Sequence, residues 1–525
     1  MICYLLIAGG RAAACANPDT KHADMAGHLI GKITIKTGGI FDLSNPQEDK
    51  ALFRLANKVH ITTRQNVIRN QLLFSTGESF SAQKIEESER LLRKNRYLQT
   101  ISIQPTQGAS GLVDIDVITT DSWTLTPIIS ASRSGGENKT ALGFKELNLF
   151  GSGVAVEFFR RTDVDRDSST IKITDRNIGR SWYALSLRVE NNNDGHLRFL
   201  SLGKPFYSLH SRRTRGIIAL DVDQIEHFYD LGEDLAQYRH QSNYREVYFG
   251  WSKGLLDGWS KRFTTGITYD EHRFSAASIL PQDRKFVYPF FGIELLQDRY
   301  EKTMNYEQLN IVEDRFLGTR LSLRLGLAHA NFGSDRDAWL YKAVAQTAFE
   351  KSAKTSVLLA AVLDGRLEDA GVRNLSLDLS ARYYKRQSQH RLLFIELSGI
   401  YGHNLDLDRF LLLGGNSGLR GYPLRYQTGD RRALLTVEQR FFSNWYPFRL
   451  FHVGAAIFFD IGRTWGDGPV SPAAESWLKD VGFGLRIGNT RLALGKMIHV
   501  DLAFPLDGKD DIKSVQFLVS TKKKF

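Results

Sequence analysis

Cysteine is almost absent from this chain: its 525 residues include only Cys3 and Cys15. If the segment that carries both is removed from the mature chain, neither disulfides nor metal thiolates hold the fold. Signatures of catalysis are missing as well, because the sequence contains no Gly-x-Ser-x-Gly, His-Glu-x-x-His, Cys-x-x-Cys or Gly-Lys-Ser/Thr pattern. Its 13 histidines show no metal-ligand spacing. The sequence therefore predicts a protein that is not an enzyme and uses no metal and no cofactor.

Long apolar runs are missing too. Hydrophobic residues make up 42% of the chain, yet no run approaches the roughly eighteen apolar residues that a membrane-spanning helix needs. Proline is rare, with 12 residues, whereas 45 glycines and an aromatic fraction of 11% suit many strands joined by tight turns. This composition is typical of a membrane β-barrel, in which apolar residues alternate with polar ones instead of forming runs.

The first residues have the features of a secretory leader. The apolar run Met1–Ala8 is followed by Ala14-Cys15-Ala16, which has the small-x-small form of a signal-peptidase site. We therefore predict a signal peptide at residues 1–16. No Lys or Arg precedes the run, so two alternatives stay open: a start further upstream or a clipped leader. Cys15 as a lipoprotein cysteine is a third, disfavoured because Ala12 stands where leucine is usual.

A small α+β domain is predicted between residues 28 and 120. Helix-period apolar residues and the N-cap candidate Ser81 indicate two helices, flanked by strands whose apolar residues alternate. The resulting order is βααββ. The predicted strands are Lys32–Lys36, Leu98–Gln104 and Leu112–Thr119, and the predicted helices are Thr63–Phe74 and Ser81–Arg93.

From Trp123 onward the helical period gives way to strict alternation. In Leu321–Leu327, leucines alternate with polar or small residues, one of which is Arg324. The net charge of +11 is spread along such polar faces instead of forming a patch, which argues against nucleic acid as a partner. We therefore assign the chain to the membrane all-β class, with a C-terminal transmembrane β-barrel over residues 123–525. The alternating segments number roughly twenty.

One loop between predicted strands, Leu411–Pro423, is rich in glycine and carries a single charge. Its glycines let the backbone fold back tightly, and Arg420 stands between Leu419 and the pair Gly421-Tyr422. This stretch resembles the Leu/Val-Arg-Gly-Tyr/Phe signature of the outer-membrane assembly and two-partner secretion barrels, the superfamily of the BamA-type and TamA-type proteins. The resemblance implies a long extracellular loop that folds into the barrel lumen. It also implies about sixteen barrel strands, so either some segments are loop hairpins or this barrel is enlarged.

The small domain resembles the POTRA domain, the periplasmic module of the same superfamily, and one copy is visible. The similarity lies in Gly77, Phe80, Leu91–Tyr97 and Asp114–Val117. It implies that the domain binds a polypeptide client or a periplasmic partner. We expect its strands after Leu98 and Leu112 to offer a backbone edge to an extended client.

Arg420 needs carboxylate partners if its loop enters the lumen, because a bare charge in a confined space is costly. Strand parity points Asp460 inward, opposite Ile457 and Phe459, and it places Glu438 on the polar face of its own strand. The Phe-x-Asp-x-Gly pattern around Asp460 matches the family motif whose aspartate holds the loop arginine, and Glu438 matches a lumenal glutamate of the family. The alternative is that inward charges of any barrel pair at random.

The barrel is expected to close between the first strand, Trp123–Ser132, and the last, Val515–Ser520. Pro127 has no N–H for the ladder, and the last strand is short, so this seam is predicted to hold few hydrogen bonds. Val515, Phe517 and Val519 share one parity with the terminal Phe525. A C-terminal aromatic resembles the recognition signal for barrel insertion, although Lys523 stands where an apolar residue is typical.

These observations predict a bacterial outer-membrane protein that inserts or translocates polypeptides, with the small domain in the periplasm and outer-membrane lipid around the barrel. Two alternatives remain. One is a passive or lipid-conducting channel, and the other is a two-partner secretion transporter, whose members usually carry two POTRA domains and a plug helix. The sequence does not identify the client, the strand number or the oligomeric state.

Overall fold

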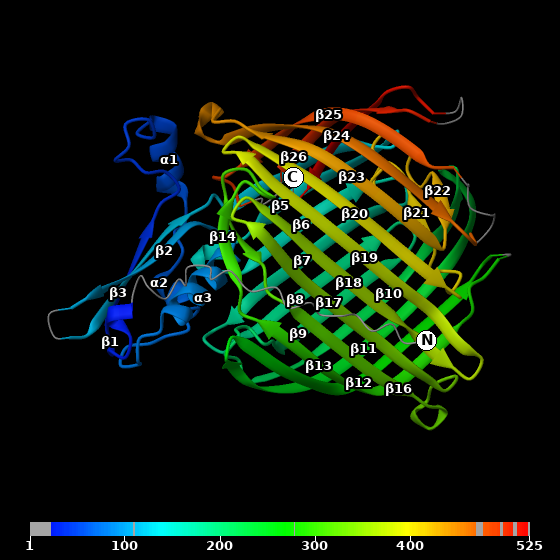
Figure 1. Ribbon diagram of the computed structural model, residues 1–525, viewed down its shortest axis with the longest axis horizontal. Coiled ribbons are helices and arrows are strands. Elements are labelled where there is room, and N and C mark those ends of the chain that lie inside the picture. Colours follow the sequence, from blue (N-terminus) through cyan, green and yellow to red (C-terminus); the bar gives the residue numbers. More distant parts are fainter. Residues whose placement is uncertain are drawn as a thin grey trace.

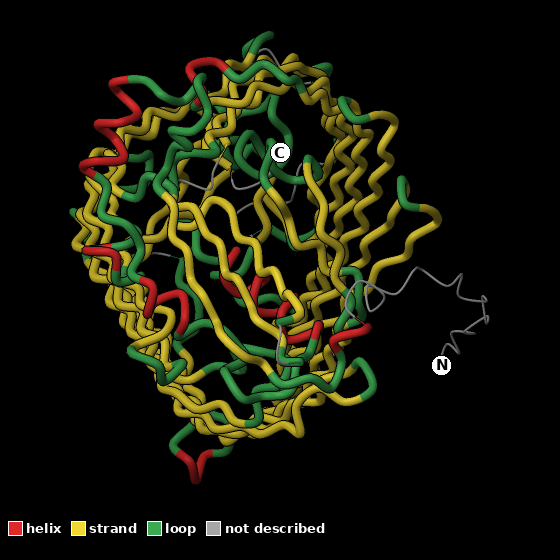
Figure 2. Tube along the Cα trace, turned by 90° about the vertical axis from the view of Figure 1, so that its left-hand side faces the viewer, coloured by secondary structure: helices red, strands yellow, loops and turns green. Residues whose placement is uncertain are grey.

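The computed structural model describes residues 23–108, 111–277, 279–468, 476–493, 497–507 and 512–522; the predicted signal peptide and Phe525 lie outside the described residues. A small N-terminal domain stands at one end of a large barrel (Figure 1). Seen from that end, the barrel strands form a closed ring, and segments of the N-terminal domain lie across its opening (Figure 2). We call this end the proximal rim and the other the distal end.

The N-terminal domain is a three-stranded sheet packed against helices. β1 runs parallel to the central strand β3, and β2 runs antiparallel to it. Ile115 of β3 is fully buried in one core with Ile68 and Leu92 from the helices. The predicted N-cap Ser81 accepts a hydrogen bond from the Lys84 N–H at 3.4 Å. The elements are β1 (Ile30–Gly38), α1 (Ala51–Val59), α2 (Gln65–Arg69), α3 (Ala82–Arg93), β2 (Leu98–Gln107) and β3 (Val113–Asp121), after a 3-10 turn at Ala23–Met25.

The predicted order βααββ is wrong, because the domain has the additional helix α1. Sequence reasoning missed α1, whose first residue follows Lys50 with no side-chain cap; the helical spacing of Leu52, Leu55 and Val59 is the signal that could have identified it. The helix predicted over Thr63–Phe74 is also shorter. α2 ends at Arg69, and the chain then turns so that Leu72 and Phe74 enter the domain core.

The edges of the sheet differ from the expectation as well. β3 is paired on both sides, so the strand after Leu112 offers no free edge. β2 pairs with β3 alone in the described sheet and contains Pro105, a residue that edge strands tolerate. The outer edge of β2 is occupied at one point, where the Ile103 N–H donates to Glu89 of α3 at 2.8 Å, and its use by a client stays a prediction.

Twenty antiparallel strands close the barrel, so the family template of about sixteen is wrong for this chain. The strands are β4 (Leu125–Ser134), β5 (Glu137–Glu146), β6 (Ala155–Thr162), β7 (Asp167–Ile178), β8 (Tyr183–Asn192), β9 (His196–Lys204), β10 (Arg213–Asp230), β11 (Glu233–Leu256), β12 (Trp259–Ser275), β13 (Arg284–Gln297), β16 (Arg320–Ala328), β17 (Ala338–Ser352), β18 (Thr355–Glu368), β19 (Gly371–Ser388), β20 (Arg391–His403), β23 (Arg431–Phe442), β24 (Phe451–Trp465), β25 (Leu478–Asn489), β26 (Met497–Pro505) and β27 (Gln516–Lys522). Each strand of this list pairs with the strands before and after it, and the last strand, β27, pairs with the first, β4.

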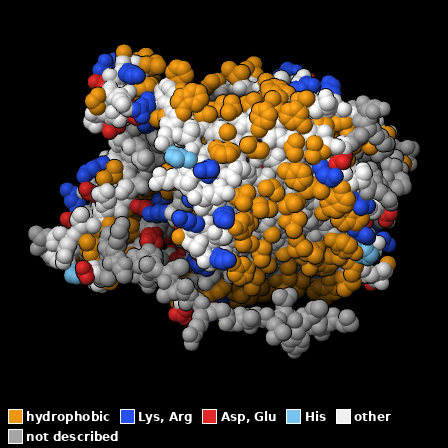
Figure 3. Space-filling model, turned by 45° about the horizontal axis from the view of Figure 1, so that its top comes forward, with side chains coloured by type: hydrophobic (Ala, Val, Ile, Leu, Met, Phe, Trp, Pro, Cys, Tyr) orange, Lys and Arg blue, Asp and Glu red, His pale blue; other side chains and the backbone are white. Residues whose placement is uncertain are grey.

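The alternation of the sequence sorts side chains between the lumen and the outside. On β16, Leu321, Leu323 and Leu325 are exposed on the outer face. Arg324, between Leu323 and Leu325, points to the lumen and pairs with Glu246 at 2.6 Å. Apolar side chains cover much of the outer surface in Figure 3. Such a surface suits lipid contact. None of the helices in the described part of the chain is long and apolar enough to cross a membrane.

In the described part of the chain, two short hairpins are not part of the barrel wall. β14 (Tyr300–Met304) pairs with β15 (Val312–Phe316) in the connection from β13 to β16, and β21 (Leu411–Leu413) pairs with β22 (Gln427–Gly429) in the connection from β20 to β23. In Figure 1, β14 lies at the proximal rim and β21 and β22 lie toward the distal end. The barrel is thus enlarged, and it also contains loop hairpins.

Candidate functional site

The glycine-rich loop is a compact structure inside the barrel. Leu419 and Tyr422 are fully buried in a cluster with Leu413 and Leu478. Within the loop, the Gly415 N–H donates to the Pro423 carbonyl at 2.9 Å. The β21–β22 pairing closes the base of the loop, which fixes the central Leu-Arg-Gly-Tyr stretch against the wall formed by β23, β24 and β25.

Arg420 makes the predicted contacts with Asp460 and Glu438. Its Nε and Nη2 donate to Asp460 at 2.7 and 2.9 Å, and its Nη1 donates to Glu438 at 2.8 Å. The guanidinium also lies 3.5 Å from the centre of the Phe458 ring. Burial by itself lowers the pKa of Arg420, but the charges of Asp460 and Glu438 outweigh it and raise this pKa above its ordinary value. Arg420 is therefore always charged, and its ion pairs hold the loop against β23 and β24.

Gly421 and Tyr422 hold the next part of the loop against β25. The Gly421 N–H donates to Asp480 at 3.0 Å, and a Cβ on Gly421 would lie 2.7 Å from the Asp480 Cβ, so only glycine fits. The Tyr422 hydroxyl lies 2.8 Å from the Lys479 carbonyl and 2.7 Å from the Asp507 carbonyl. Asp480 is a site residue that the sequence reasoning missed. Its inward parity within Leu478–Asn489 is the signal that could have identified it, since it stands opposite Asp460.

Glu438 connects this loop to the hairpin at the proximal rim. One of its oxygens accepts from Arg420 and the other from Arg440 Nε, the latter at 2.9 Å. Arg440 Nη1 also donates to the carbonyl of Tyr306, in the tip between β14 and β15, at 2.8 Å. Loop and hairpin are therefore linked through Glu438 and Arg440 of β23.

The tip of the β14–β15 hairpin is anchored on the far wall of the barrel. Tyr306 and Leu309 are buried in a cluster that includes Tyr384 and Phe442 of the barrel strands. Asn310 contacts His452 at 2.7 Å. Arg315 of β15 donates to Ser356 of β18, and Arg386 of β19 donates to the Asn305 carbonyl, both at 2.6 Å, so the hairpin lies against the inner wall from β18 to β24. No motif in the sequence distinguishes it from a wall strand pair.

The base of the same hairpin binds helix α3 of the N-terminal domain. Arg93 donates to Asp314 through two nitrogens, at 2.8 and 2.7 Å, and Lys302 pairs with Glu89. Arg90 lies 3.8 Å from the centre of the Tyr300 ring. A continuous series of polar contacts therefore runs from α3 through the hairpin to Arg420.

The closing seam is described only as far as Lys522, because residues 523–525, which follow β27, lie outside the described residues. Among the described residues, β27 and β4 share one partner pair, Val519 with Arg133, whereas β4 pairs with β5 along its whole length. Pro127 lies in β4 opposite Phe144 of β5. Phe517 is in β27, but Val515 precedes that strand, which begins at Gln516. The predicted first strand Trp123–Ser132 is likewise displaced, since β4 begins at Leu125 and ends at Ser134.

A lumenal cavity lies directly inside this seam. Its volume is about 640 Å³, and its lining includes Arg420 and Glu438 on one side and Val519 on the other. Arg425, which pairs with Asp165, also contributes to it. The site thus brings together the locked loop, a polar cavity and the weakest strand junction of the described barrel.

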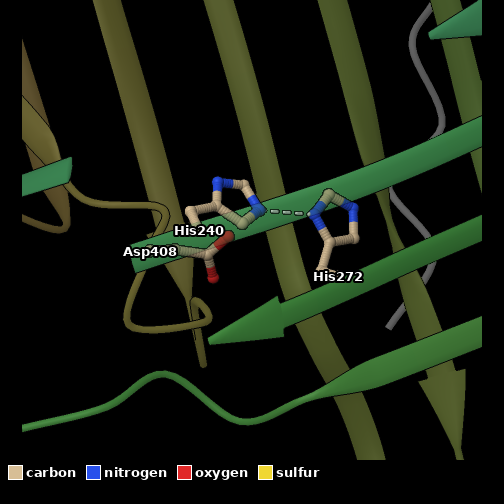
Figure 4. Close-up of side chains that lie close together, drawn as sticks. All are labelled: His240, His272 and Asp408. Atoms are coloured by element: carbon tan, nitrogen blue, oxygen red, sulfur yellow. Dashed lines mark hydrogen bonds between the residues drawn. The ribbon is translucent and has the colours of Figure 1, made fainter. Parts of the chain in front are cut away.

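A separate group of ligand-type side chains lies on the inner face of β11 and β12, below the loop after β20. His240 and His272 are hydrogen-bonded at 2.9 Å, with Asp408 beside them (Figure 4). Both Asp408 oxygens accept from Arg284, at 3.0 and 2.8 Å, and His272 contacts Asp270 at 3.2 Å. These contacts already use the groups that a metal would need, so the cluster is accounted for by protein contacts.

No protein-family model matches this chain, and no curated protein matches its sequence. Solved structures do match. BamA from Haemophilus ducreyi lacking POTRA domains 1–3 is 11% identical, with 93% of this chain and 84% of that chain covered and a TM-score of 0.39. CdiB from Acinetobacter baumannii is 13% identical, with coverages of 94% and 74% and a TM-score of 0.48. CdiB from Escherichia coli is 11% identical, with coverages of 95% and 77% and a TM-score of 0.49. Each is a similarity of overall fold at low identity.

Proposed function

We propose that this protein inserts or translocates polypeptides at the bacterial outer membrane, with the N-terminal domain on the periplasmic side. The observation that carries the proposal is the seam between β4 and β27. One described residue pair joins these strands, and the cavity lined by Arg420 opens directly behind it. A strand junction with few hydrogen bonds, each contributing about 0.5–1.5 kcal/mol net, can part while the other junctions hold. An open seam offers unpaired backbone to an incoming strand.

The lumen itself supports this proposal over a passive channel. The β14–β15 hairpin lies inside the proximal rim, and the Arg420 loop enters the lumen from the distal end. These two inserted segments, linked through Glu438 and Arg440, narrow the lumen along the wall at β23. The position of β2 at the edge of its sheet supports the client-binding part of the proposal, because an extended polypeptide can add as a further strand where the edge is not occupied by Glu89.

The test is to lock the seam with a disulfide between Arg133→Cys and Val519→Cys, in a chain with Cys3→Ser and Cys15→Ser. Proteoliposomes containing the protein are given an unfolded outer-membrane β-barrel, and folding of that client is followed by its heat-modifiable gel mobility. We expect the locked protein to lose its acceleration of client folding, and reduction to restore it.

A matched control places the disulfide in a fully paired junction, at Leu397→Cys and Leu435→Cys on β20 and β23, which stand opposite each other. This variant is expected to remain active under oxidising conditions. Full activity of the seam-locked protein with its disulfide formed excludes lateral opening and favours conduction through the lumen.

A further inference from the structure

Helix α1 exposes an apolar face that the N-terminal domain does not cover. Leu52, Leu55 and Val59 are 68%, 55% and 57% exposed, and their spacing places them on one side of the helix. Phe53 points the other way, where it is buried and stacks on Phe41 at 4.1 Å between ring centres. The two faces of α1 therefore differ: among the described residues, the Phe53 face packs against other apolar side chains, and the face with Leu52, Leu55 and Val59 is exposed.

The buried face holds α1 on the proximal rim of the barrel. Phe53, Phe41 and Ile40 form a cluster against which Trp123 and Leu450 of the barrel chain pack. Arg491, after β25, donates to the Ile40 carbonyl at 2.6 Å and pairs with Glu48. These contacts fix the height of α1 at the end of the barrel wall, as Figure 1 shows.

Other apolar side chains are exposed at the same rim. Trp445 and Phe448, in the turn between β23 and β24 that also carries Leu450, are 65% and 80% exposed. Phe150, in the turn between β5 and β6, is 63% exposed, and this turn contacts the segment after α1 through the Arg64 N–H and the Gly151 carbonyl at 3.1 Å. In Figure 3, apolar side chains on the N-terminal domain at the upper left stand close to those at the edge of the barrel.

Basic residues flank the apolar face of α1. Arg54 and Lys58 are exposed and lie on the helix side next to Leu55, and Lys50 precedes the helix. Arg54 pairs with the exposed Asp49 at 2.7 Å, so Lys58 is the cation of this side without an acidic partner among the described residues. A short amphipathic helix with leucines on one face and Lys or Arg beside them is the form that lies in a membrane surface and contacts anionic headgroups. The apolar outer face of the barrel requires the same membrane to end at this rim.

We propose that α1 lies in the surface of the membrane that surrounds the barrel, in the leaflet at the proximal rim. Leu52, Leu55 and Val59 enter the boundary between headgroups and acyl chains, and Arg54 and Lys58 contact anionic lipid phosphates. The exposed Trp445, Phe448 and Phe150 continue this contact around the rim. The helix thereby fixes the N-terminal domain against the membrane as well as against the barrel.

The experiment uses the full chain with Cys3→Ser and Cys15→Ser, reconstituted in vesicles of phosphatidylcholine with phosphatidylglycerol. A nitroxide is attached at Leu55→Cys, and its collision rates with oxygen and with a water-soluble nickel chelate are measured by electron paramagnetic resonance. Leu323→Cys on the outer face of β16 is the lipid-facing control, and Gln104→Cys on β2 is the aqueous control. We expect the oxygen-to-nickel ratio at position 55 to be several-fold above that at position 104 and close to that at position 323.

Two results overturn the proposal. A ratio at position 55 equal to that at position 104 places α1 in water, and protection from both reagents shows that protein covers the helix. The contribution of charge is tested with Lys58→Glu in the Leu55→Cys chain. This substitution is expected to lower the ratio in vesicles with phosphatidylglycerol but not in phosphatidylcholine alone, and an unchanged ratio in both removes the headgroup contact from the proposal.

Discussion

Arg420 is only 6% exposed, and each nitrogen of its guanidinium donates to Asp460 or Glu438. Removing one member of a buried ion pair typically costs about 3–5 kcal/mol, because the remaining charge keeps its desolvation cost. We therefore predict that Arg420→Ala lowers the unfolding midpoint of the barrel, measured by heat-modifiable gel mobility, and reduces client folding. Arg420→Lys is expected to be intermediate, since an ammonium group cannot donate bidentately to Asp460.

Arg160→Ala is the matched control, because the Arg160 side chain is 70% exposed and lies 3.7 Å from its nearest acidic partner. This substitution is expected to leave both quantities unchanged. Equal midpoints for Arg420→Ala and Arg160→Ala would mean that the buried contact does not stabilise the barrel.

The β14–β15 hairpin is the element that connects the most distant parts of the molecule. Its base binds Arg93 of α3, and its tip binds Arg440 through the Tyr306 carbonyl. Replacing the tip, residues 305–311, by two glycines removes the side chains that the hairpin places inside the proximal rim. We predict a several-fold higher conductance in planar bilayers, because the obstruction on that side is lost while every wall strand remains.

The control for this element is Ala353→Gly with Lys354→Gly in the turn between β17 and β18, which is expected to keep the conductance of the parent chain. If the shortened hairpin also conducts like the parent, the lumen is closed elsewhere, and the Arg420 loop becomes the principal barrier.

At the scale of the whole molecule, the N-terminal domain and the barrel are separable in sequence but joined by specific contacts. Asp121, at the end of β3, is fully buried and accepts from Thr63, whose hydroxyl in turn accepts from Asn148 of the barrel at 2.8 Å. Because the twenty strands close without residues 28–118, we predict that their deletion leaves a barrel that still inserts. Client folding in proteoliposomes should nevertheless be lost, since the β2 edge is removed.

Insertion of the deleted chain is checked by its heat-modifiable mobility, and client folding by the assay used for the seam. Undiminished client folding by the isolated barrel would show that the N-terminal domain is not needed for client handling.

The sequence by itself determined the class of the fold and the partners of Arg420. Period-two alternation fixes which side chains of a strand face lipid and which face the lumen, so it was sufficient to orient Asp460 and Glu438 inward. The resemblance of the residues around Asp460 to the Phe-x-Asp-x-Gly motif of the family, and of Glu438 to a lumenal glutamate of the family, then selected these two from the other inward carboxylates. The short last strand and Pro127 are the features from which the sequence predicts sparse pairing at the seam.

Only the tertiary structure decided the number of strands, the hairpin inside the proximal rim and the position of α1. Alternation is the same for a wall strand and for β14–β15, since both bury one face, so the pattern does not reveal which pairs join the wall. Asp480 is recognised as a site residue because the structure places it opposite Asp460 on the neighbouring strand. The exposed leucines of α1 point to membrane contact only because α1 lies at the proximal rim, since the sequence does not show which surface a helix face meets. These features depend on contacts between residues far apart in the chain, which a local pattern does not specify.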